Sequence, residues 1–178
     1  DRYTNFNFIK GRNVFLDGYF FEKLTQFQFD FACDNIFPLI WPEKIHNLSD
    51  RIAVHIRGGD FLNFEQYHIC DESYYLDNIN RILSMYGDKK IYVVSDDIEY
   101  SRKLLTRFKH SVDFISSDMM SDFDFISSSR FIIGSNSTFC FWSALVSGLK
   151  SDENKRIILP GEWRRGIQRK IRIKSELI

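Results

Sequence analysis

The sequence predicts an α/β fold, with a parallel sheet at the centre and helices on its faces. Short apolar segments of strand type, at 52–56, 90–94 and 131–133, are separated by longer segments of helix type. Two of these strands lead directly into polar turns that contain glycine, Arg57–Asp60 and Gly134–Thr138. Because the carboxyl ends of parallel strands open into ligand-binding loops, we expect a Rossmann-like domain with its site at this edge.

The composition is that of a globular domain. With 178 residues, 44% hydrophobic and 27% charged, the chain can hold one sizeable core and is not of the disordered class. Its 24 basic and 24 acidic residues balance, so no nucleic-acid partner is expected. The cysteines, Cys33, Cys70 and Cys140, are scattered without metal-site spacing, and we expect reduced thiols in a cytoplasmic protein. No signal peptide or run of transmembrane length is visible.

Residues 1–50 are expected to form a linker and helices ahead of the main domain. Val14–Phe21 is a short strand-like piece broken by a turn at Asp17, although Asp17 and Tyr19 could also line a cleft. Apolar residues recur at helical spacing between Phe21 and Leu39 and predict one or two helices there.

The first strand of the main domain ends in an anion-binding type of turn. Ile52–Ile56 has β-branched residues at alternate positions, as in a buried strand. Arg57 then offers a permanently charged fork of donors that suits a phosphate, and the following glycines allow close backbone approach. The alternative is an ordinary tight turn with a surface ion pair between Arg57 and Asp60.

A strand–helix–strand unit follows. Asp71 is placed to cap a helix over Glu72–Tyr86, whose apolar residues share one face, and Gly87 ends it. The next strand, Lys90–Val94, is therefore parallel to the first and connected by a right-handed crossover.

Two aspartates close this second strand. One of Asp96 and Asp97 is expected to cap the next helix, from Ile98 to Phe108. The other could orient Arg57, which would lie on the same sheet edge, or bind a ribose hydroxyl.

The third strand, Val112–Ile115, leads into an acidic loop that contains Asp122 and Asp124. An Asp-x-Asp pair can hold a divalent ion on a diphosphate. We prefer a capping role, because the pair precedes a helix-like segment at Phe125 and because Arg57 makes a metal unnecessary. No metal ligand is therefore predicted.

The second polar turn repeats the design of the first. Phe131–Ile133 is an apolar strand, and Phe139–Val146 is of helical type. Asn136 or Ser137 can cap this helix, whose free amides and partial positive charge attract an anion.

The last strand is predicted at Ile157–Leu159 and is followed by a basic C-terminal tail, 163–178. We expect a solvated terminal helix. The alternative is contact with an anionic membrane surface. The basic residues of this tail are Arg164, Arg165, Arg169, Lys170, Arg172 and Lys174.

Three ordered blocks resemble a known family. His55-x-Arg57-x-x-Asp60, Ser95-Asp96-Asp97 and Asn136-Ser-Thr-Phe-x-x-Trp142 are similar to the signatures of the α-1,2-fucosyltransferases, glycosyltransferase family 11. The similarity runs from about Val14 to Trp163 and departs at Gly58, where a second arginine is usual. It also departs at Cys140-Phe141, which stand in place of Ser-Trp.

The resemblance implies a GT-B-like, inverting and metal-independent enzyme. Its donor would be GDP-fucose, and its acceptor a galactoside hydroxyl of a glycan such as a surface polysaccharide. The family carries a Gly-Asn-rich block ahead of anything present here, so a fragment is implied. Residues 1–50 would be the remnant of the acceptor half, 51–162 the GDP-fucose-binding domain and 163–178 the tail, and the fragment alone could be inactive.

The resemblance also implies roles for the residues of the donor site. His55 would lie near the nucleoside, and Arg57 would bind the β-phosphate and stabilise the leaving group. Asn136, Ser137 and Thr138, with the amides of their helix, would hold the phosphates. His55 could instead be a satisfied core histidine.

Carboxylates complete the implied site. Asp124, with Asp122 second, would accept hydrogen bonds from the guanine ring. Asp96 would shape the site, and Asp60 would fix the loop, orient Arg57 or simply cap the turn.

The general base is assigned to Glu65, with His68 as the other titratable group nearby. Glu65 matches a base-like glutamate only in the related α-1,6 branch, and it could be a solvated loop carboxylate.

Other functions stay open at this point. One is a fucosyltransferase of other regiochemistry, including one that acts on protein. A second is a GDP-sugar-binding domain without catalysis, and a third is a structural Rossmann-like module. A peripheral position at the inner face of the membrane is expected if the basic tail binds lipid.

Overall fold

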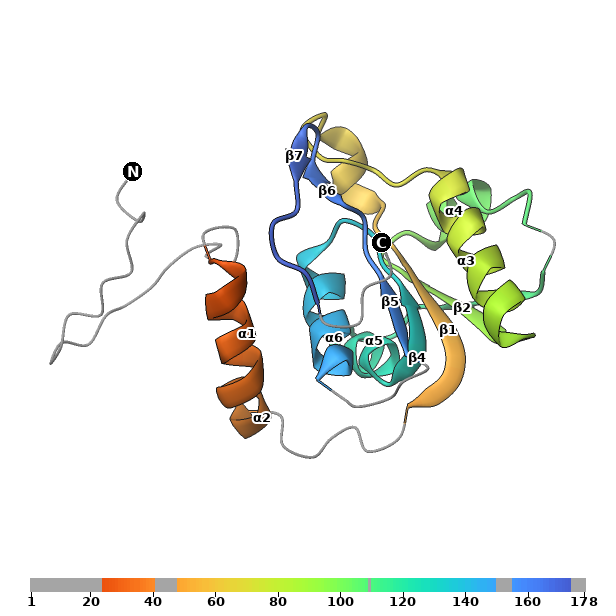
Figure 1. The fold of residues 1–178 in the computed structure, drawn as a ribbon. Helices are drawn as coiled ribbons and strands as arrows, with labels where there is room; N and C mark the ends of the chain where they lie inside the picture. The colour runs from red at the N-terminus through yellow and green to blue at the C-terminus, as the bar shows by residue number, and fades with distance from the viewer. Residues whose placement is uncertain (1–23, 41–47, 109, 150–154, 174–178) are drawn as a thin grey trace, which may run out of the picture.

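A five-stranded parallel sheet forms the centre of the structure (Figure 1). The computed structural model describes residues 24–40, 48–108, 110–149 and 155–173. Adjacent strands of this sheet are all parallel and lie in the order β3-β2-β1-β4-β5. The predicted strands are confirmed, and only their ends shift. The strands are β1 (Ser49–Ile56), β2 (Lys90–Ser95), β3 (Val112–Ile115), β4 (Ser129–Ile133) and β5 (Arg156–Ile158).

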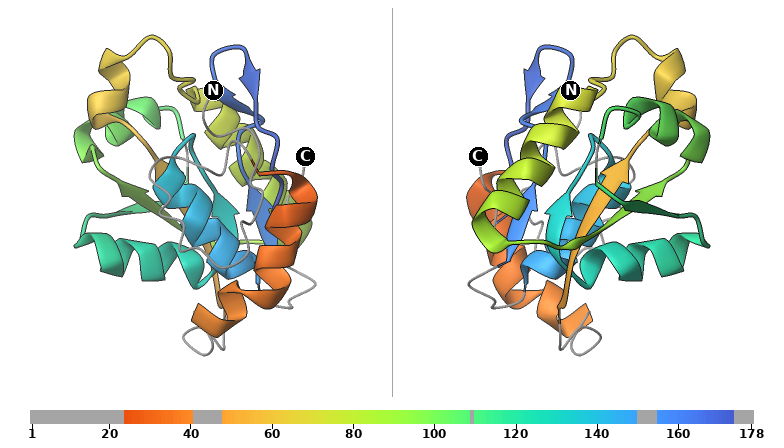
Figure 2. Two further views of the ribbon diagram at one scale, coloured as in Figure 1. Left: turned by 90° about the vertical axis from the view of Figure 1, so that its left-hand side faces the viewer. Right: turned by 90° about the vertical axis from the view of Figure 1, so that its right-hand side faces the viewer.

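Helices cover both faces of the sheet (Figure 2). On one face, α3 (Glu72–Tyr86) and α4 (Ile98–Leu104) pack on alternate strand residues such as Val54 and Val93. The other face, which includes Ala53, is covered by α5 (Met119–Ser127) and α6 (Thr138–Gly148). Because β-strand side chains alternate between faces, the apolar strands supply both cores at once. The α/β class predicted from the sequence is confirmed.

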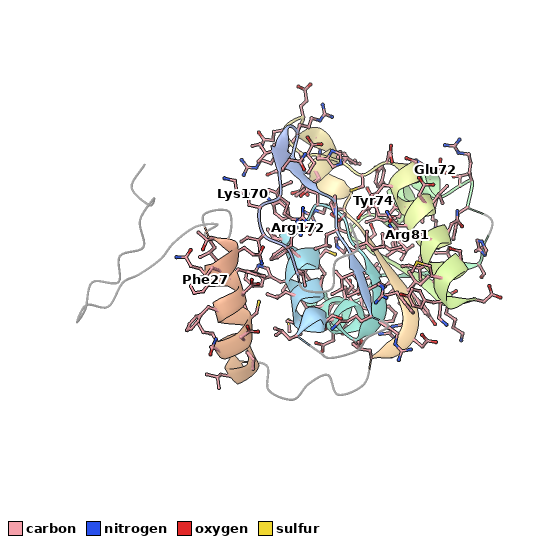
Figure 3. The ribbon with its side chains drawn as sticks, viewed as in Figure 1. Phe27, Glu72, Tyr74, Arg81, Lys170 and Arg172 are labelled. Carbon is pink, nitrogen blue, oxygen red and sulfur yellow. The ribbon has the colours of Figure 1, made fainter. Side chains whose placement is uncertain are left out.

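An outer pair of helices, α1 (Gln26–Asn35) and α2 (Phe37–Ile40), confirms the helices predicted before Leu39. Phe29 and Cys33 of α1 are buried in the same cluster as α6. The opposite side of α1 is open to solvent, with Phe27 79% exposed and pointing away from the sheet (Figure 3). The strand-like piece predicted at Val14–Phe21, with Asp17 and Tyr19, lies outside the described residues.

Side-chain caps set the helix starts. Asp71 accepts the backbone N–H of Tyr74 at 2.9 Å, as predicted, and Gly87 ends α3 with a φ of 75°. The predicted start of α5 near Phe125 is wrong, because Asp118 already caps a helix over Met119–Ser127. Asp122 and Asp124 therefore lie within α5 rather than ahead of it.

The terminal helix predicted for the basic tail is also wrong. Strands β6 (Glu162–Arg164) and β7 (Ile167–Gln168) form an antiparallel hairpin that turns at Gly166, whose φ is 73°. Beyond it the chain is extended, so that alternate residues Ile171 and Ile173 are buried against the core.

The end of the described chain is tied to α1 and to the hairpin. Gln26 exchanges two hydrogen bonds with the backbone of Arg172, which Figure 3 shows between the hairpin and α1. The Arg169 guanidinium donates to the carbonyls of Pro160 and Ile171. The observed core thus includes residues on both sides of 51–162. Within the described ranges, no helix has the length and apolar character that a membrane crossing requires.

Candidate functional site

The site lies where the chain leaves β1 and β4, two neighbouring strands at the centre of the sheet. After β1 the crossover to β2 runs through α3 on one face, whereas after β4 it runs through α6 on the other. Such a switch point leaves a crevice at the carboxyl edge, where open α/β sheets bind ligands. A cleft of about 390 Å³ occupies this position. It is lined by Arg57, Asp60, Phe61, Tyr67, Asn136, Ser137, Thr138, Phe139, Trp163 and Arg164.

Arg57 is held in place by two carboxylates. Its Nη2 lies 2.6 Å from Asp60 Oδ1, and its Nη1 lies 2.8 Å from Asp96 Oδ2. The other oxygen of Asp96 accepts the backbone N–H of Gly58 at 2.9 Å. Asp97 instead caps α4, because its side chain accepts the N–H of Tyr100. Of the two aspartates, Asp96 therefore orients Arg57 and Asp97 caps the helix. Arg57 enters the cleft as a pre-oriented cation.

The guanidinium of Arg57 has further contacts and a spare donor. Its carbon lies 4.8 Å from the centroid of the Phe61 ring. Arg57 Nε is buried and has no hydrogen-bond partner within the described part of the chain. A buried donor without a partner beside a cleft is consistent with a ligand oxygen at this position.

The turn after Arg57 requires glycine twice. A Cβ atom at Gly58 would lie 2.9 Å from both Asp97 Cβ and Tyr100 Cδ1. Gly59 has a φ of 49°, and a Cβ there would lie 2.7 Å from Asp96 Oδ2. The backbone therefore packs directly on Asp96, which positions Arg57, and on Asp97, which caps α4. This explains physically why position 58 carries no arginine in this chain.

The opposite wall is the start of α6. Ser137 is its N-cap residue with extended φ and ψ (−144° and 134°), but its side chain makes no capping hydrogen bond. The predicted position of the cap is confirmed, but the predicted side-chain bond is absent. Ser137 and Thr138 line the cleft. Because the first amides of a helix have no intrahelical acceptor and carry partial positive charge, this wall suits an anion.

Asn136 connects this wall to two other segments. Its buried side-chain amide donates to the carbonyl of His68 at 3.2 Å and to that of Trp163. It therefore positions the loop before α3 and the β6–β7 hairpin around the cleft. Tyr74, labelled in Figure 3, adds a hydrogen bond of 2.8 Å from its hydroxyl to the carbonyl of Gly134 at the end of β4.

His55 lies beneath the cleft and not among its lining residues. It is 5% exposed, and its Nδ1 lies 2.7 Å from Ser135 Oγ. Its ring centroid is 5.7 Å from that of Phe139, which does line the cleft. Burial, and then the positive charge of Arg57, lower the pKa of His55 to about 3, so the imidazole is neutral at pH 7. The contacts are those of the satisfied core histidine considered above.

Other predicted residues lie away from the lining. Glu65 is exposed in the loop after Asn63, and Asp124 is exposed on α5. Asp122 Oδ1 accepts the N–H of Ser117 at 3.2 Å, and burial raises the pKa of this carboxyl. The roles predicted for Glu65 and Asp124 stay predictions.

No metal-binding geometry is found in the parts of the chain that the structure describes. Asp122 and Asp124 are two positions apart on a helix, and residues at this spacing do not face each other. Among the described residues, no group of three His, Cys, Asp or Glu side chains could hold an ion. Cys33, Cys70 and Cys140 are buried and form no disulfide with one another.

Sequence reasoning missed the aromatic and hairpin side of the cleft. Phe61 and Tyr67 stack with 4.1 Å between ring centroids and 11° between planes. Trp163 and Arg164 come from β6, which is held by a bridge between Tyr67 and Arg164. The aromatic–basic cluster Trp163-Arg-Arg165 could have indicated a binding surface, but the prediction for this segment was a solvated tail.

Comparisons with known proteins agree with this geometry. A family model described as Glycosyl transferase family 11 matches residues 5–156. The chain is 30% identical over 123 residues to a protein named Alpha-1,2-colitosyltransferase from Escherichia coli. This alignment covers 65% of the chain and 41% of that relative, so the chain matches less than half of the relative's length. No solved structure matches.

Proposed function

The chain belongs to glycosyl transferase family 11, and from this premise we propose that it binds the nucleotide-sugar donor of an inverting α-1,2-glycosyltransferase. The proposed donor is GDP-fucose, and the proposed acceptor is a galactoside hydroxyl of a glycan. The name of the relative favours a second donor class, one that carries a colitosyl group. GDP-fucose presents a diphosphate to the protein, and we propose that a colitosyl donor would do so through the same cleft.

One observation carries the proposal: Arg57, held by Asp60 and Asp96, shares a cleft with the uncapped start of α6. A diphosphate needs several donors and positive charge from more than one side. The guanidinium supplies them from the β1 end, and the Ser137 and Thr138 segment supplies them from the β4 end. Aromatic rings on the same cleft offer apolar faces for a nucleoside or a sugar.

The proposed reaction is a single displacement. An acceptor hydroxyl attacks the anomeric carbon, the bond from that carbon to the diphosphate oxygen breaks, and GDP leaves with the electron pair. Arg57 stabilises the negative charge that develops on the leaving group. The two carboxylates hold the guanidinium in place, so little reorganisation is needed during the reaction. In this proposal the positive charge comes from the protein and not from a metal ion.

A base must take the proton of the acceptor hydroxyl. Glu65 remains the proposed base, and its exposed position leaves it accessible to an acceptor. His68, the other candidate, lies 2.9 Å from Glu162 through its Nδ1, an ion pair when the ring is protonated. This contact favours a positioning role for His68, because it connects the loop to the hairpin.

The guanine ring of the donor also has to be recognised. Asp124 remains the proposed guanine-reading residue. Its neighbour Phe123 contacts Phe139 of the cleft, with 5.8 Å between ring centroids. A fucosyltransferase of other regiochemistry and a GDP-sugar-binding domain without turnover remain alternatives.

We also propose a cytoplasmic location at the inner face of the membrane, where exposed Lys170 and Arg172 would meet anionic lipid.

Calorimetric titration with GDP, and with ADP as the control nucleotide, tests the donor site. We expect GDP binding that is weakened about 10- to 100-fold in Arg57→Ala, because a charged phosphate contact is lost. Arg81→Ala, an exposed arginine on α3 outside the cleft, is the matched control and should bind as the wild type does. A folded wild-type chain that does not bind GDP would refute the proposal. Turnover of labelled GDP-fucose with galactosides then separates transferase from binding domain.

A further inference from the structure

The charge around Arg57 is not positive in total. Arg57 contributes one formal positive charge, whereas Asp60 and Asp96, both within 2.8 Å of it, contribute one negative charge each. This group of three side chains is therefore formally negative by one. A nucleoside diphosphate brings at least two further negative charges, and like charges at this separation repel. Beyond the partial charge at the start of α6, a second cation in the cleft would offset this repulsion.

Position 58 cannot supply that cation. A side chain there would begin 2.9 Å from Asp97 Cβ and Tyr100 Cδ1, closer than carbon atoms pack. The backbone N–H of Gly58 is moreover bound to Asp96, so the turn cannot move without releasing the contact that orients Arg57. An arginine directly after Arg57 is incompatible with this turn.

A second arginine reaches the cleft from a distant part of the sequence. Among the described residues that line the cleft, Arg57 and Arg164 are the basic ones. Arg164 ends β6, and its backbone bridges to Tyr67 across the rim. The N–H of Arg165 donates to the carbonyl of Gln66 at 3.2 Å, and Asn136 binds the carbonyl of Trp163. The backbone at Arg164 is thus held beside the cleft that Arg164 lines together with Arg57 and the start of α6.

We propose that Arg164 is the second phosphate-binding cation of the donor site, in place of the arginine that the turn excludes at Gly58. The inference rests on the proposed function, because it takes the ligand to be a nucleoside diphosphate. It removes Arg164 from the basic surface considered for membrane contact. It also gives the β6–β7 hairpin a function, which is to bring a second positive charge to the leaving group.

The test is calorimetric titration of the full chain with GDP at several salt concentrations. Arg164→Gln, which keeps a polar side chain but removes the charge, should bind GDP about tenfold more weakly and with a smaller dependence on salt. Arg164→Lys keeps the charge and should stay within about threefold of the wild type, because a point charge still attracts phosphate. Arg165→Gln is the matched control, an exposed neighbour that does not line the cleft.

The outcomes distinguish the role of Arg164 from the existence of the donor site. If Arg57→Ala loses GDP but Arg164→Gln binds with the affinity and salt dependence of the wild type, the role of Arg164 is refuted and the donor site stands. Equal loss in Arg164→Lys and Arg164→Gln with unchanged salt dependence would also refute it, since a purely structural role predicts this. If the folded wild type binds no GDP, both the donor site and the role of Arg164 fall.

Discussion

Adding a single methyl group at Gly58 should measurably destabilise the protein. In Gly58→Ala the new Cβ would lie 2.9 Å from Asp97 Cβ and from Tyr100 Cδ1, so the turn or α4 must shift. Overpacking of this kind costs about 1–3 kcal/mol of the free energy of unfolding. Replacing glycine by alanine also restricts the unfolded chain, which returns roughly 0.4–1 kcal/mol. The difference spans about 0–2.6 kcal/mol, and the expected net loss is the middle of that range, about 1.3 kcal/mol.

Urea denaturation followed by circular dichroism measures this loss. With a slope of about 2 kcal/mol per molar urea, the midpoint should fall by about 0.6 M. Gly161→Ala is the matched control, because the nearest atom to its Cβ, Gln168 Oε1, is at an ordinary 3.5 Å. That variant should unfold at or slightly above the wild-type midpoint. If Gly58→Ala and Gly161→Ala have the same midpoint, the argument from close packing at the turn is refuted.

The same packing predicts the effect of restoring the arginine that is usual at this position. Gly58→Arg should be at least as destabilised as Gly58→Ala, and its GDP affinity should fall rather than rise. The reason is that the shifted turn releases the N–H of Gly58 from Asp96 and with it the orientation of Arg57. A Gly58→Arg variant that binds GDP more tightly than the wild type would contradict this account.

Further predictions concern titration, capping and the connection across the cleft. His55 has a pKa of about 3 when folded against 6.5 as its ordinary value, so only the unfolded state takes up its proton as the pH falls below 6.5. The free energy of unfolding, measured by urea titration, should therefore drop from pH 7 to pH 5 by roughly 2 kcal/mol more in the wild type than in His55→Gln. The control variant, His110→Gln at an exposed position, should behave as the wild type. Asp71→Ala should lower the free energy of unfolding by about 0.5–2 kcal/mol in thermal melts, through loss of the α3 cap. Asn136→Ala should expose the β6–β7 hairpin to limited proteolysis, whereas Asn35→Ala, whose amide donates to the carbonyl of Phe31 within α1, should not.

Each of these has a clear contrary result. Parallel pH profiles of wild type and His55→Gln would show that the imidazole titrates normally. An unchanged melting temperature in Asp71→Ala would mean that α3 starts independently of its cap. Equal protease resistance in Asn136→Ala would show that the hairpin is held by other contacts.

Local chemistry allowed much of this fold to be predicted from the sequence. A strand such as β2 is recognised because its residues are apolar and β-branched, and the start of α3 because Asp71 offers an acceptor to the first free N–H groups. The parallel arrangement follows from the strand–helix–strand order, since a crossover has one favoured hand. Arg57 and the Ser137–Thr138 turn could be placed on one sheet edge for the same reason.

Only the tertiary structure decided which side chains meet across that edge. Asp96 and Asp97 are equivalent in sequence, and their separate roles depend on which one the packing directs toward Gly58. His55 is buried beneath the cleft, because a strand's last residues can face the core as well as the ligand.

The basic segment after Glu162 is the clearest case of a structure that the sequence did not predict. Its sequence has apolar and basic residues that suit an exposed helix, a hairpin or an extended strap, since short segments have weak intrinsic preferences. The hairpin is held by the side-chain amide of Asn136, 27 residues before Trp163, and by the bridge to Tyr67, 97 residues before Arg164. These partners come close to the segment only after the chain has folded. The sequence by itself therefore determined the strands of the sheet, the helices α3, α4 and α6, and the position of Arg57. Long-range contacts determined that Trp163 and Arg164 complete the cleft.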